Sequence, residues 1–186
     1  MRSVYITVTI LFCLSRTSFA PFAGPYNIVP LELGMCPSSD CECPKFTFSN
    51  YKIRKLSRSS YVYSGTINST VDISDDIKIA INVSSWGNGG WKPNFFYNEM
   101  LACSGLEKYL PEFKHEMFSR VNASCPAPAG VYTIENLSFV QESPVMQSLV
   151  YGKYKTWIKG YDKTGNCMGC VTFNCNIVPK PKKKQN

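Results

Sequence analysis

The chain has 186 residues, of which 44% are hydrophobic and 13% aromatic, and its formal net charge is +7. This length suits a single domain with a sizeable core. Arg2 and Arg16 supply two of the positive charges near the N-terminus, and four lysines lie within residues 180–184. Because the rest of the chain is close to neutral, the charge does not indicate a nucleic-acid groove, and residues 179–186 are interpreted as a disordered basic tail.

Residues 1–20 have the pattern of a secretory signal peptide. Arg2 precedes an apolar run over residues 4–14, and small residues stand at Ser18 and Ala20. A membrane-spanning helix needs roughly 20 apolar residues, about twice the length of this run. We therefore expect cleavage after Ala20, a secreted product, and one folded domain over residues 21–178.

The cysteines agree with export. Removal of Cys13 with the leader leaves an even number, which in an oxidising compartment predicts four disulfides and no free thiol, with about 105 pairings open. The close pairs 41/43 and 167/170 would also suit zinc, but the single histidine, His115, is far from both in the sequence. We favour disulfides and expect neither a metal nor a cofactor. The eight cysteines are Cys36, Cys41, Cys43, Cys103, Cys125, Cys167, Cys170 and Cys175.

The first part of the predicted domain changes from irregular to strand-like composition. Residues 21–45 are rich in proline and cysteine and are predicted to be irregular. Residues 46–56, 60–67 and 77–83 carry aromatic or alternating apolar residues, the pattern of half-buried strands.

Two segments next to the third strand are interpreted as turns. Asp75 and Asp76 are taken as a polar turn, because adjacent residues of a strand point in opposite directions and so would not form an acid/base pair. Residues 84–91 form a glycine-rich loop flanked by Trp86 and Trp91, and glycine suits a tight hairpin. The loop lacks the Gly-Lys-Ser/Thr ending of a phosphate-binding loop.

Residues 98–121 change to a helical period. One apolar stripe recurs at steps of three and four residues, and it consists of Leu106, Leu110, Phe113, Met117 and Val121. Pro111 is predicted to divide this region into two helices and to open the second, since proline suits the first turn of a helix. His115 falls off the stripe and is expected to be exposed.

The C-terminal part returns to strands, predicted over residues 131–139, 151–161 and 170–178. Residues 162–166 form a predicted turn, and residues 143–150 form a connection that is unusually apolar for a loop. The whole pattern predicts an all-β sandwich or cup of about seven to eight antiparallel strands with a helical insertion.

Four sequons for N-glycosylation also suit an exported chain, and each would have to face water if it is used. They begin at Asn68, Asn82, Asn122 and Asn136.

An ordered set of short motifs resembles a known family. The segment Cys125-Pro126-Ala127-Pro128-Ala129-Gly130-Val131-Tyr132 is followed by Phe139, Pro144, residues 149–154 (Leu-Val-Tyr-Gly-Lys-Tyr) and Gly169-Cys170, with Cys103 upstream. This order is similar to the C-terminal half of the ganglioside-activator protein family, to arthropod chemosensory proteins of the CheB type, and more broadly to lipid-recognition (ML) domains. The resemblance covers residues 91–178.

The resemblance implies a β-cup whose apolar cavity takes up a lipid tail and whose rim loops touch membrane transiently. It implies that Cys103 pairs with Cys125, that an N-terminal cysteine pairs with Cys170, and that the lipid is an acyl chain, glycolipid or phospholipid. It also implies a receptor or enzyme partner and a secreted or lysosomal location. We expect the cavity and rim to include Trp86, Trp91, Phe95, Leu106, Phe113, Met117, Phe139, Val145, Met146, Leu149 and Trp157.

Three alternatives stand beside a lipid carrier. The aromatic and methionine residues could simply fill a core. The chain could instead be an extracellular protein-binding, chemosensory or effector module with a collapsed cavity. An enzyme is disfavoured, because there is no Gly-x-Ser-x-Gly elbow and a single peripheral histidine cannot supply a catalytic relay.

Overall fold

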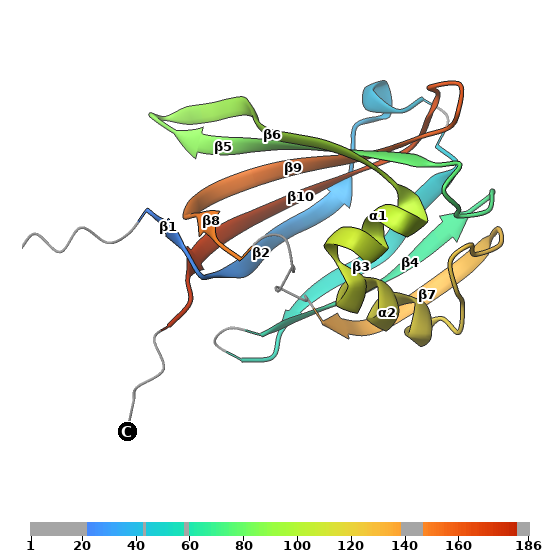
Figure 1. Ribbon diagram of the computed structural model, residues 1–186, viewed down its shortest axis with the longest axis horizontal. Helices are drawn as coiled ribbons and strands as arrows, with labels where there is room; N and C mark the ends of the chain where they lie inside the picture. Colours follow the sequence, from blue (N-terminus) through green and yellow to red (C-terminus); the bar gives the residue numbers. More distant parts are fainter. Residues whose placement is uncertain (1–21, 43, 58–59, 139–146, 182–186) are drawn as a thin grey trace, which may run out of the picture.

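The computed structural model describes residues 22–42, 44–57, 60–138 and 147–181 (Figure 1). Every strand pair in these ranges is antiparallel, which confirms the predicted all-β class. The strands are β1 (Ala23–Gly24), β2 (Tyr26–Met35), β3 (Phe46–Lys55), β4 (Tyr61–Ser69), β5 (Lys78–Gly87), β6 (Gly90–Leu101), β7 (Gly130–Ser138), β8 (Leu149–Val150), β9 (Gly152–Tyr161) and β10 (Cys167–Pro179). The helices are a short 3-10 helix η1 (Ser38–Asp40), α1 (Ala102–Tyr109) and α2 (Pro111–Arg120).

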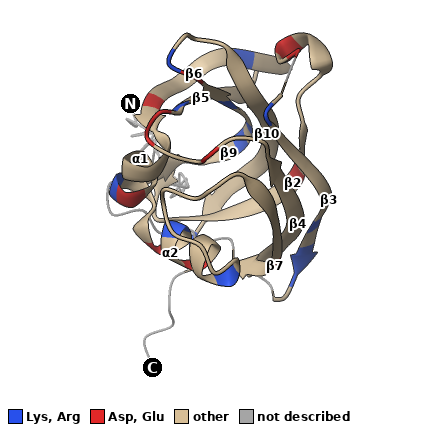
Figure 2. Cartoon of the chain, turned by 90° about the vertical axis from the view of Figure 1, so that its right-hand side faces the viewer, with Lys and Arg blue, Asp and Glu red and all other residues tan. Residues whose placement is uncertain are grey.

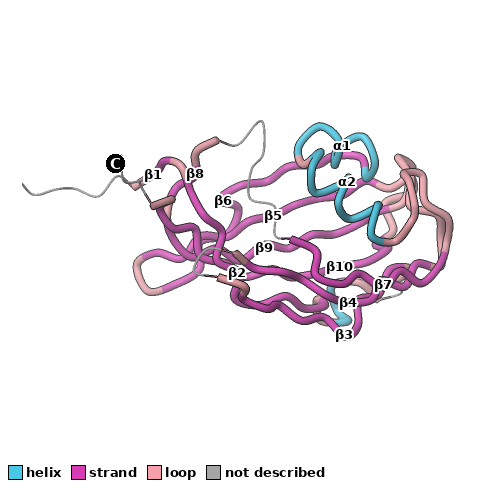
Figure 3. The backbone as a smooth tube through the Cα atoms, turned by 90° about the horizontal axis from the view of Figure 1, so that it is seen from below, coloured by secondary structure: helices cyan, strands magenta, loops and turns pink. Residues whose placement is uncertain are grey.

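The strands form two main sheets. A five-stranded sheet has the order β2-β10-β9-β5-β6, a three-stranded sheet has the order β3-β4-β7, and β1 pairs with β8 alone. Seen end-on, the two main sheets curve towards each other, with β2 beside β3 and the helices between β6 and β7 (Figure 2). Figure 3 shows α1 and α2 together on one side of the strands. The result is a β-cup whose helices connect an edge strand of each sheet.

The prediction that residues 21–45 are irregular is wrong, because residues 26–35 form β2, an edge strand of the large sheet. Pro30 weakened the strand signal in the sequence. An edge strand tolerates proline, since one side of its backbone has no partner strand and a missing N–H there breaks no ladder. Pro30 lies opposite Cys175, next to an irregularity in the pairing of β2 with β10.

The glycine-rich segment is a hairpin, as predicted, but its loop is shorter than eight residues. Strands β5 and β6 continue through Trp86 and Trp91, which are paired across the hairpin. The turn itself is Asn88-Gly89, with φ angles of 51° and 79°. Positive φ at both central residues is what a two-residue hairpin turn requires, and asparagine followed by glycine supplies it at low cost.

The helical insertion follows the predicted division at Pro111. Strand β6 runs to Leu101, so the helical part begins at residue 102, and α2 opens with Pro111-Glu112. The stripe residues Phe113, Met117 and Val121 pack on a buried cluster of the three-stranded sheet. In the described part of the chain, no helix has both the length and the apolar character needed to cross a membrane.

Three disulfides join described cysteines: Cys36–Cys170, Cys41–Cys167 and Cys103–Cys125. Two of them are the pairings that the family resemblance implied. Because Cys167 and Cys170 belong to two separate disulfides, they do not form the zinc site that their spacing allowed. The expectation of four disulfides is wrong for Cys175, which is a buried free thiol. Cys43 lies outside the described residues.

Candidate functional site

The inner face of the large sheet carries two adjoining rows of side chains across β2, β10, β9 and β5, and all of them except Thr156 are apolar. Leu33 of β2 packs on the cluster that contains Tyr63 of β4, so this face looks towards the three-stranded sheet. Despite this position between two sheets, all eight side chains of the rows are only half-buried. The first row is Met35, Val171, Ile158 and Ile81, and the second is Leu33, Phe173, Thr156 and Val83.

A buried cluster that contains two tyrosines lies at one end of this face. Tyr26, Tyr154, Cys175 and Ile177 are buried together, and Leu149 of β8 packs against them. The Tyr154 hydroxyl donates a hydrogen bond to the carbonyl oxygen of Val150 at 2.8 Å. Burial raises the pKa of Tyr154 and raises that of the Cys175 thiol to about 12, so both groups stay neutral.

The facing wall comes from the three-stranded sheet and α2. Tyr63, Ile134 and Leu137 are buried, and the predicted site residues Phe113 and Met117 pack on them. Burial raises the pKa of Tyr63, so its phenol is also neutral. The wall residues named here are thus uncharged on both sides. Figure 2 shows lysines, arginines and acids on several elements of the chain.

One end of the cup holds β1, β8 and the tip of the β5–β6 hairpin (Figure 1). Several aromatic residues of these segments are exposed. The Trp86 and Trp91 rings meet edge to face at 5.2 Å, and the two residues are 46% and 42% exposed. Phe95 lies 5.3 Å from the Tyr154 ring and is half exposed, and Phe22 is largely exposed. We call this end the rim.

The disulfides lie away from the rim. Cys36 and Cys41 flank η1, and their partners belong to the start of β10. Cys103 lies in the first turn of α1, and its partner Cys125 follows α2. In Figure 1 these segments are at the end opposite the β5–β6 hairpin. Covalent cross-links therefore hold one end of the cup, and the rim is left free of them among the described residues.

The predicted site residues that the structure describes lie in several places. Trp86, Trp91 and Phe95 lie at the rim, Leu149 packs on the buried cluster of Tyr26, and Phe113 and Met117 pack on the facing wall. Leu106 of α1 is half-buried. Trp157 is not part of the interior, because it alternates with the inward Ile158 along β9 and lies beside Asn82 of β5 on the outer face. Phe139, Val145 and Met146 lie outside the described residues.

Sequence reasoning missed the wall residues of β2, Leu33 and Met35, because residues 21–45 were expected to be irregular. It also missed Tyr154. The strand that contains this residue was predicted, but the face of the strand that points into the interior was not. The alternation of tyrosine, threonine and isoleucine at 154, 156 and 158 was the available signal, since residues two apart share a face of a strand.

The fold and these walls define a disulfide-bonded β-cup whose described wall residues, as named above, are uncharged. No family model and no curated protein matches the sequence. Among solved structures, chicken MD-1 complexed with lipid IVa aligns with a TM-score of 0.39 and 14% identity, over 82% of this chain and 97% of that chain. A Niemann-Pick type C2 protein from the Japanese carpenter ant aligns with a TM-score of 0.37 and 13% identity, over 77% of this chain and 97% of that chain.

Proposed function

We propose that this protein is a secreted, non-enzymatic carrier or presenter of lipid that holds an acyl chain between its two sheets. The observation that carries the proposal is the half-burial of the two apolar rows on the inner face. Side chains at the centre of a filled β-sandwich are normally close-packed and closed to water. Apolar surface that water reaches between two sheets is surface that a lipid tail can cover.

The chemistry of the walls suits a hydrocarbon ligand. Removing apolar surface from water contributes roughly 25 cal/mol per Å², so an acyl chain against these rows would bind without covalent chemistry. The phenols of Tyr63 and Tyr154 are neutral, and so is the Cys175 thiol, so no ionised wall residue named here would oppose an apolar tail. A protein-binding module with a collapsed interior would instead bury these rows fully.

The position of the rim supports transient contact with a membrane. Tryptophan is favoured at the boundary between water and lipid, because its ring is apolar and its N–H is polar. Trp86 and Trp91 stand at the hairpin tip with Phe22 exposed at the same end. The resemblance to ganglioside-activator and ML domains, including the arthropod CheB-type proteins, is part of the same proposal, as is a receptor or enzyme that accepts the lipid.

Export is supported by the three disulfides, which persist in oxidising compartments. The N-terminal leader, a single domain over residues 21–178 and use of the sequons remain predictions. Asn68, Asn122 and Asn136 are exposed as glycosylation requires, and Asn82 is half-buried.

The test is binding of a fluorescent fatty acid by delipidated protein. Thr156→Trp places a large ring on the inner face and should weaken binding at least tenfold, whereas Lys155→Trp, one residue away on the outer face, should not. Both variants must retain the wild-type melting temperature within a few degrees. The proposal fails if delipidated wild-type protein binds neither the fatty acid nor a fluorescent phospholipid, or if Thr156→Trp binds as tightly as Lys155→Trp.

A further inference from the structure

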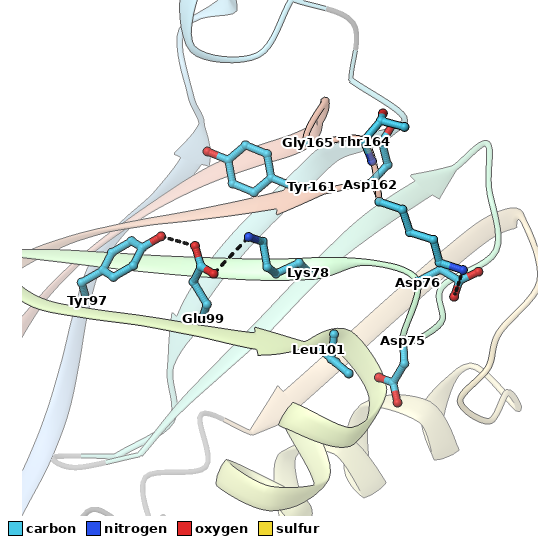
Figure 4. A pocket seen from close by; sticks show the side chains of 11 residues that line it. Asp75, Asp76, Lys78, Tyr97, Glu99, Leu101, Tyr161, Asp162, Thr164 and Gly165 are labelled. Atoms are coloured by element: carbon cyan, nitrogen blue, oxygen red, sulfur yellow. Dashed lines mark hydrogen bonds and ion pairs between the residues drawn. The ribbon is translucent and has the colours of Figure 1, made fainter.

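The outer face of the large sheet carries a groove that the lipid proposal does not use. Two adjoining hollows, of about 640 Å³ and 430 Å³, lie over β5, β6 and β9 and share Tyr97 and Tyr161 as common walls. Each volume lies in the range of roughly 300–1,000 Å³ that is usual for small-molecule sites. Figure 4 shows the larger hollow, with both tyrosine rings on the same side of the strands.

Aromatic rings line the groove along its length. Tyr97 is 56% exposed, Tyr161 is half-buried, and Trp157 lies in the smaller hollow beside Lys159. Such side chains combine an apolar face with a polar tip. A sugar ring has the matching form, since its C–H groups make an apolar face that packs on an aromatic ring while its hydroxyls point outward to polar partners.

Three polar side chains in the larger hollow are connected by a hydrogen bond and an ion pair beside these rings. The Tyr97 hydroxyl donates a hydrogen bond to Glu99, and the Glu99 carboxylate pairs with the Lys78 ammonium at 3.0 Å (Figure 4). The hydrogen bond from Tyr97, followed by that from Lys78, lowers the pKa of Glu99 and keeps it ionised. An ammonium has three donors and a carboxylate about four acceptor positions, so both keep capacity for ligand hydroxyls.

The carboxylates of this hollow are already paired, which disfavours a cation as the ligand. Asp75 accepts hydrogen bonds from the start of α1, Asp76 pairs with Lys163 at 2.8 Å, and Glu99 is held by Lys78. Asp162 accepts from the backbone N–H groups of Thr164 and Asn166 within its own turn. A site for a metal ion would present carboxylate oxygens free to coordinate it.

We propose that this outer groove binds a neutral oligosaccharide, with Tyr97, Tyr161 and Trp157 as stacking surfaces and the Lys78–Glu99 pair as hydrogen-bonding partner of its hydroxyls. The sugar has two sources. Asn82 lines the smaller hollow and begins a sequon, so a glycan attached there would start inside the groove. The other source is the glycan of a separate molecule.

Peptide mapping of the secreted protein shows whether Asn82 carries a glycan, and this result selects which of two experiments tests the proposal. If Asn82 carries a glycan, Tyr97→Ala/Tyr161→Ala should speed its trimming by an endoglycosidase several-fold, and an unchanged trimming rate overturns the proposal. If Asn82 is bare, saturation-transfer NMR should detect binding of tri-N-acetylchitotriose or mannotriose, and the same double variant should abolish it. Absence of binding for both sugars, or binding that survives the double variant, overturns the proposal.

Two controls separate this groove from the rest of the molecule. Trp86→Ala removes an exposed ring at the rim and should leave the saccharide result unchanged. Tyr97→Ala/Tyr161→Ala should leave fatty-acid binding unchanged, so failure of the groove and failure of the lipid proposal are distinguishable. Calcium binding in calorimetry, without any saccharide effect, would identify a cation site instead and would also overturn the proposal.

Discussion

The Asp75 carboxylate accepts a hydrogen bond from the backbone N–H of Ser104 at 2.9 Å, across 29 positions of sequence. The same oxygen accepts one from the N–H of Cys103 at 2.8 Å. The first N–H groups of a helix lack partners within it, and the residue before α1, Leu101, has no side chain that could supply one. Asp75 therefore caps α1 from a distant turn and ties the helical insertion to the start of β5.

Removal of this cap should destabilise the domain. We expect Asp75→Ala to lower the melting temperature by roughly 2–4 °C, as loss of a helix cap does in a domain of this size. Asp76→Ala is the matched control, because its ion pair with Lys163 is exposed on both sides and contributes little. Thermal unfolding followed by circular dichroism measures both. Equal shifts for the two variants would contradict the capping role.

The contribution of Asp75 should also depend on pH. The hydrogen bond from the Ser104 N–H is the main cause that lowers the pKa of Asp75 in the folded protein. A lowered folded-state pKa stabilises the fold above the ordinary value of 3.8, and this stabilisation is lost as pH falls through the folded pKa. The difference in melting temperature between wild type and Asp75→Ala should therefore shrink as pH falls from about 5 to about 2. A difference that is constant over this range would refute the prediction.

The Cys175 thiol should be inert in the native protein. Burial raises its pKa to about 12, and the thiolate is the reactive form. We expect iodoacetamide at about pH 8 to leave Cys175 unmodified in native protein and to modify it after unfolding without reductant, as peptide mass mapping would show. Because the folded pKa is raised, the unfolded chain loses this proton first, so stability should fall as pH rises above about 9. Rapid modification of Cys175 in native protein would contradict its burial.

The disulfides should differ in their contribution to stability according to the length of chain they close. Cys36 and Cys170 are 134 positions apart, whereas Cys103 and Cys125 are 22 apart. The Cys41–Cys167 bond joins the same two segments as Cys36–Cys170, so both bonds must be removed to release the long loop. In the chain-entropy model, release of the long loop costs at least roughly 5 kcal/mol of unfolding free energy, against roughly 3 kcal/mol for the loop of Cys103–Cys125. Serine variants, compared by urea unfolding, should therefore show a larger loss when Cys36, Cys170, Cys41 and Cys167 are all replaced than when Cys103 and Cys125 are replaced. The reverse order would show that contacts near the bond outweigh loop closure.

The rim tryptophans should control delivery of lipid to a membrane more than its uptake. Trp86→Ser/Trp91→Ser should slow fatty-acid transfer to phosphatidylcholine vesicles about tenfold, since each ring contributes apolar area to the membrane contact. The dissociation constant of this double variant for the fatty acid should differ little from that of the wild type. Trp157→Phe serves as control, because Trp157 lies on the outer face and should not affect transfer. Unchanged transfer by the double rim variant would exclude these residues from the contact.

Local pattern was sufficient to predict most elements of this fold. Aromatic or alternating apolar residues marked β3, β4, β5, β7 and β9, and the change to helical spacing with Pro111 marked the two helices. Asn88-Gly89 marked a hairpin turn because only a few residue types tolerate its backbone angles. These features depend on neighbours in the chain, so they can be recognised without knowledge of the tertiary structure.

The sequence by itself therefore determined most of the strands, both α-helices and the turns, but it did not determine β1, β2, β6 or β8. The proline of β2 is tolerated at the edge of a sheet. The tertiary structure alone decided which face of each strand looks inward. Alternation shows that Trp157 and Ile158 point in opposite directions, but only the pairing of β9 with β5 and β10 places Ile158 inside and Trp157 outside. The tertiary structure also decided that Cys175 is unpaired and that Asp75 lies within hydrogen-bonding distance of Ser104. Both outcomes depend on distances between residues far apart in the chain.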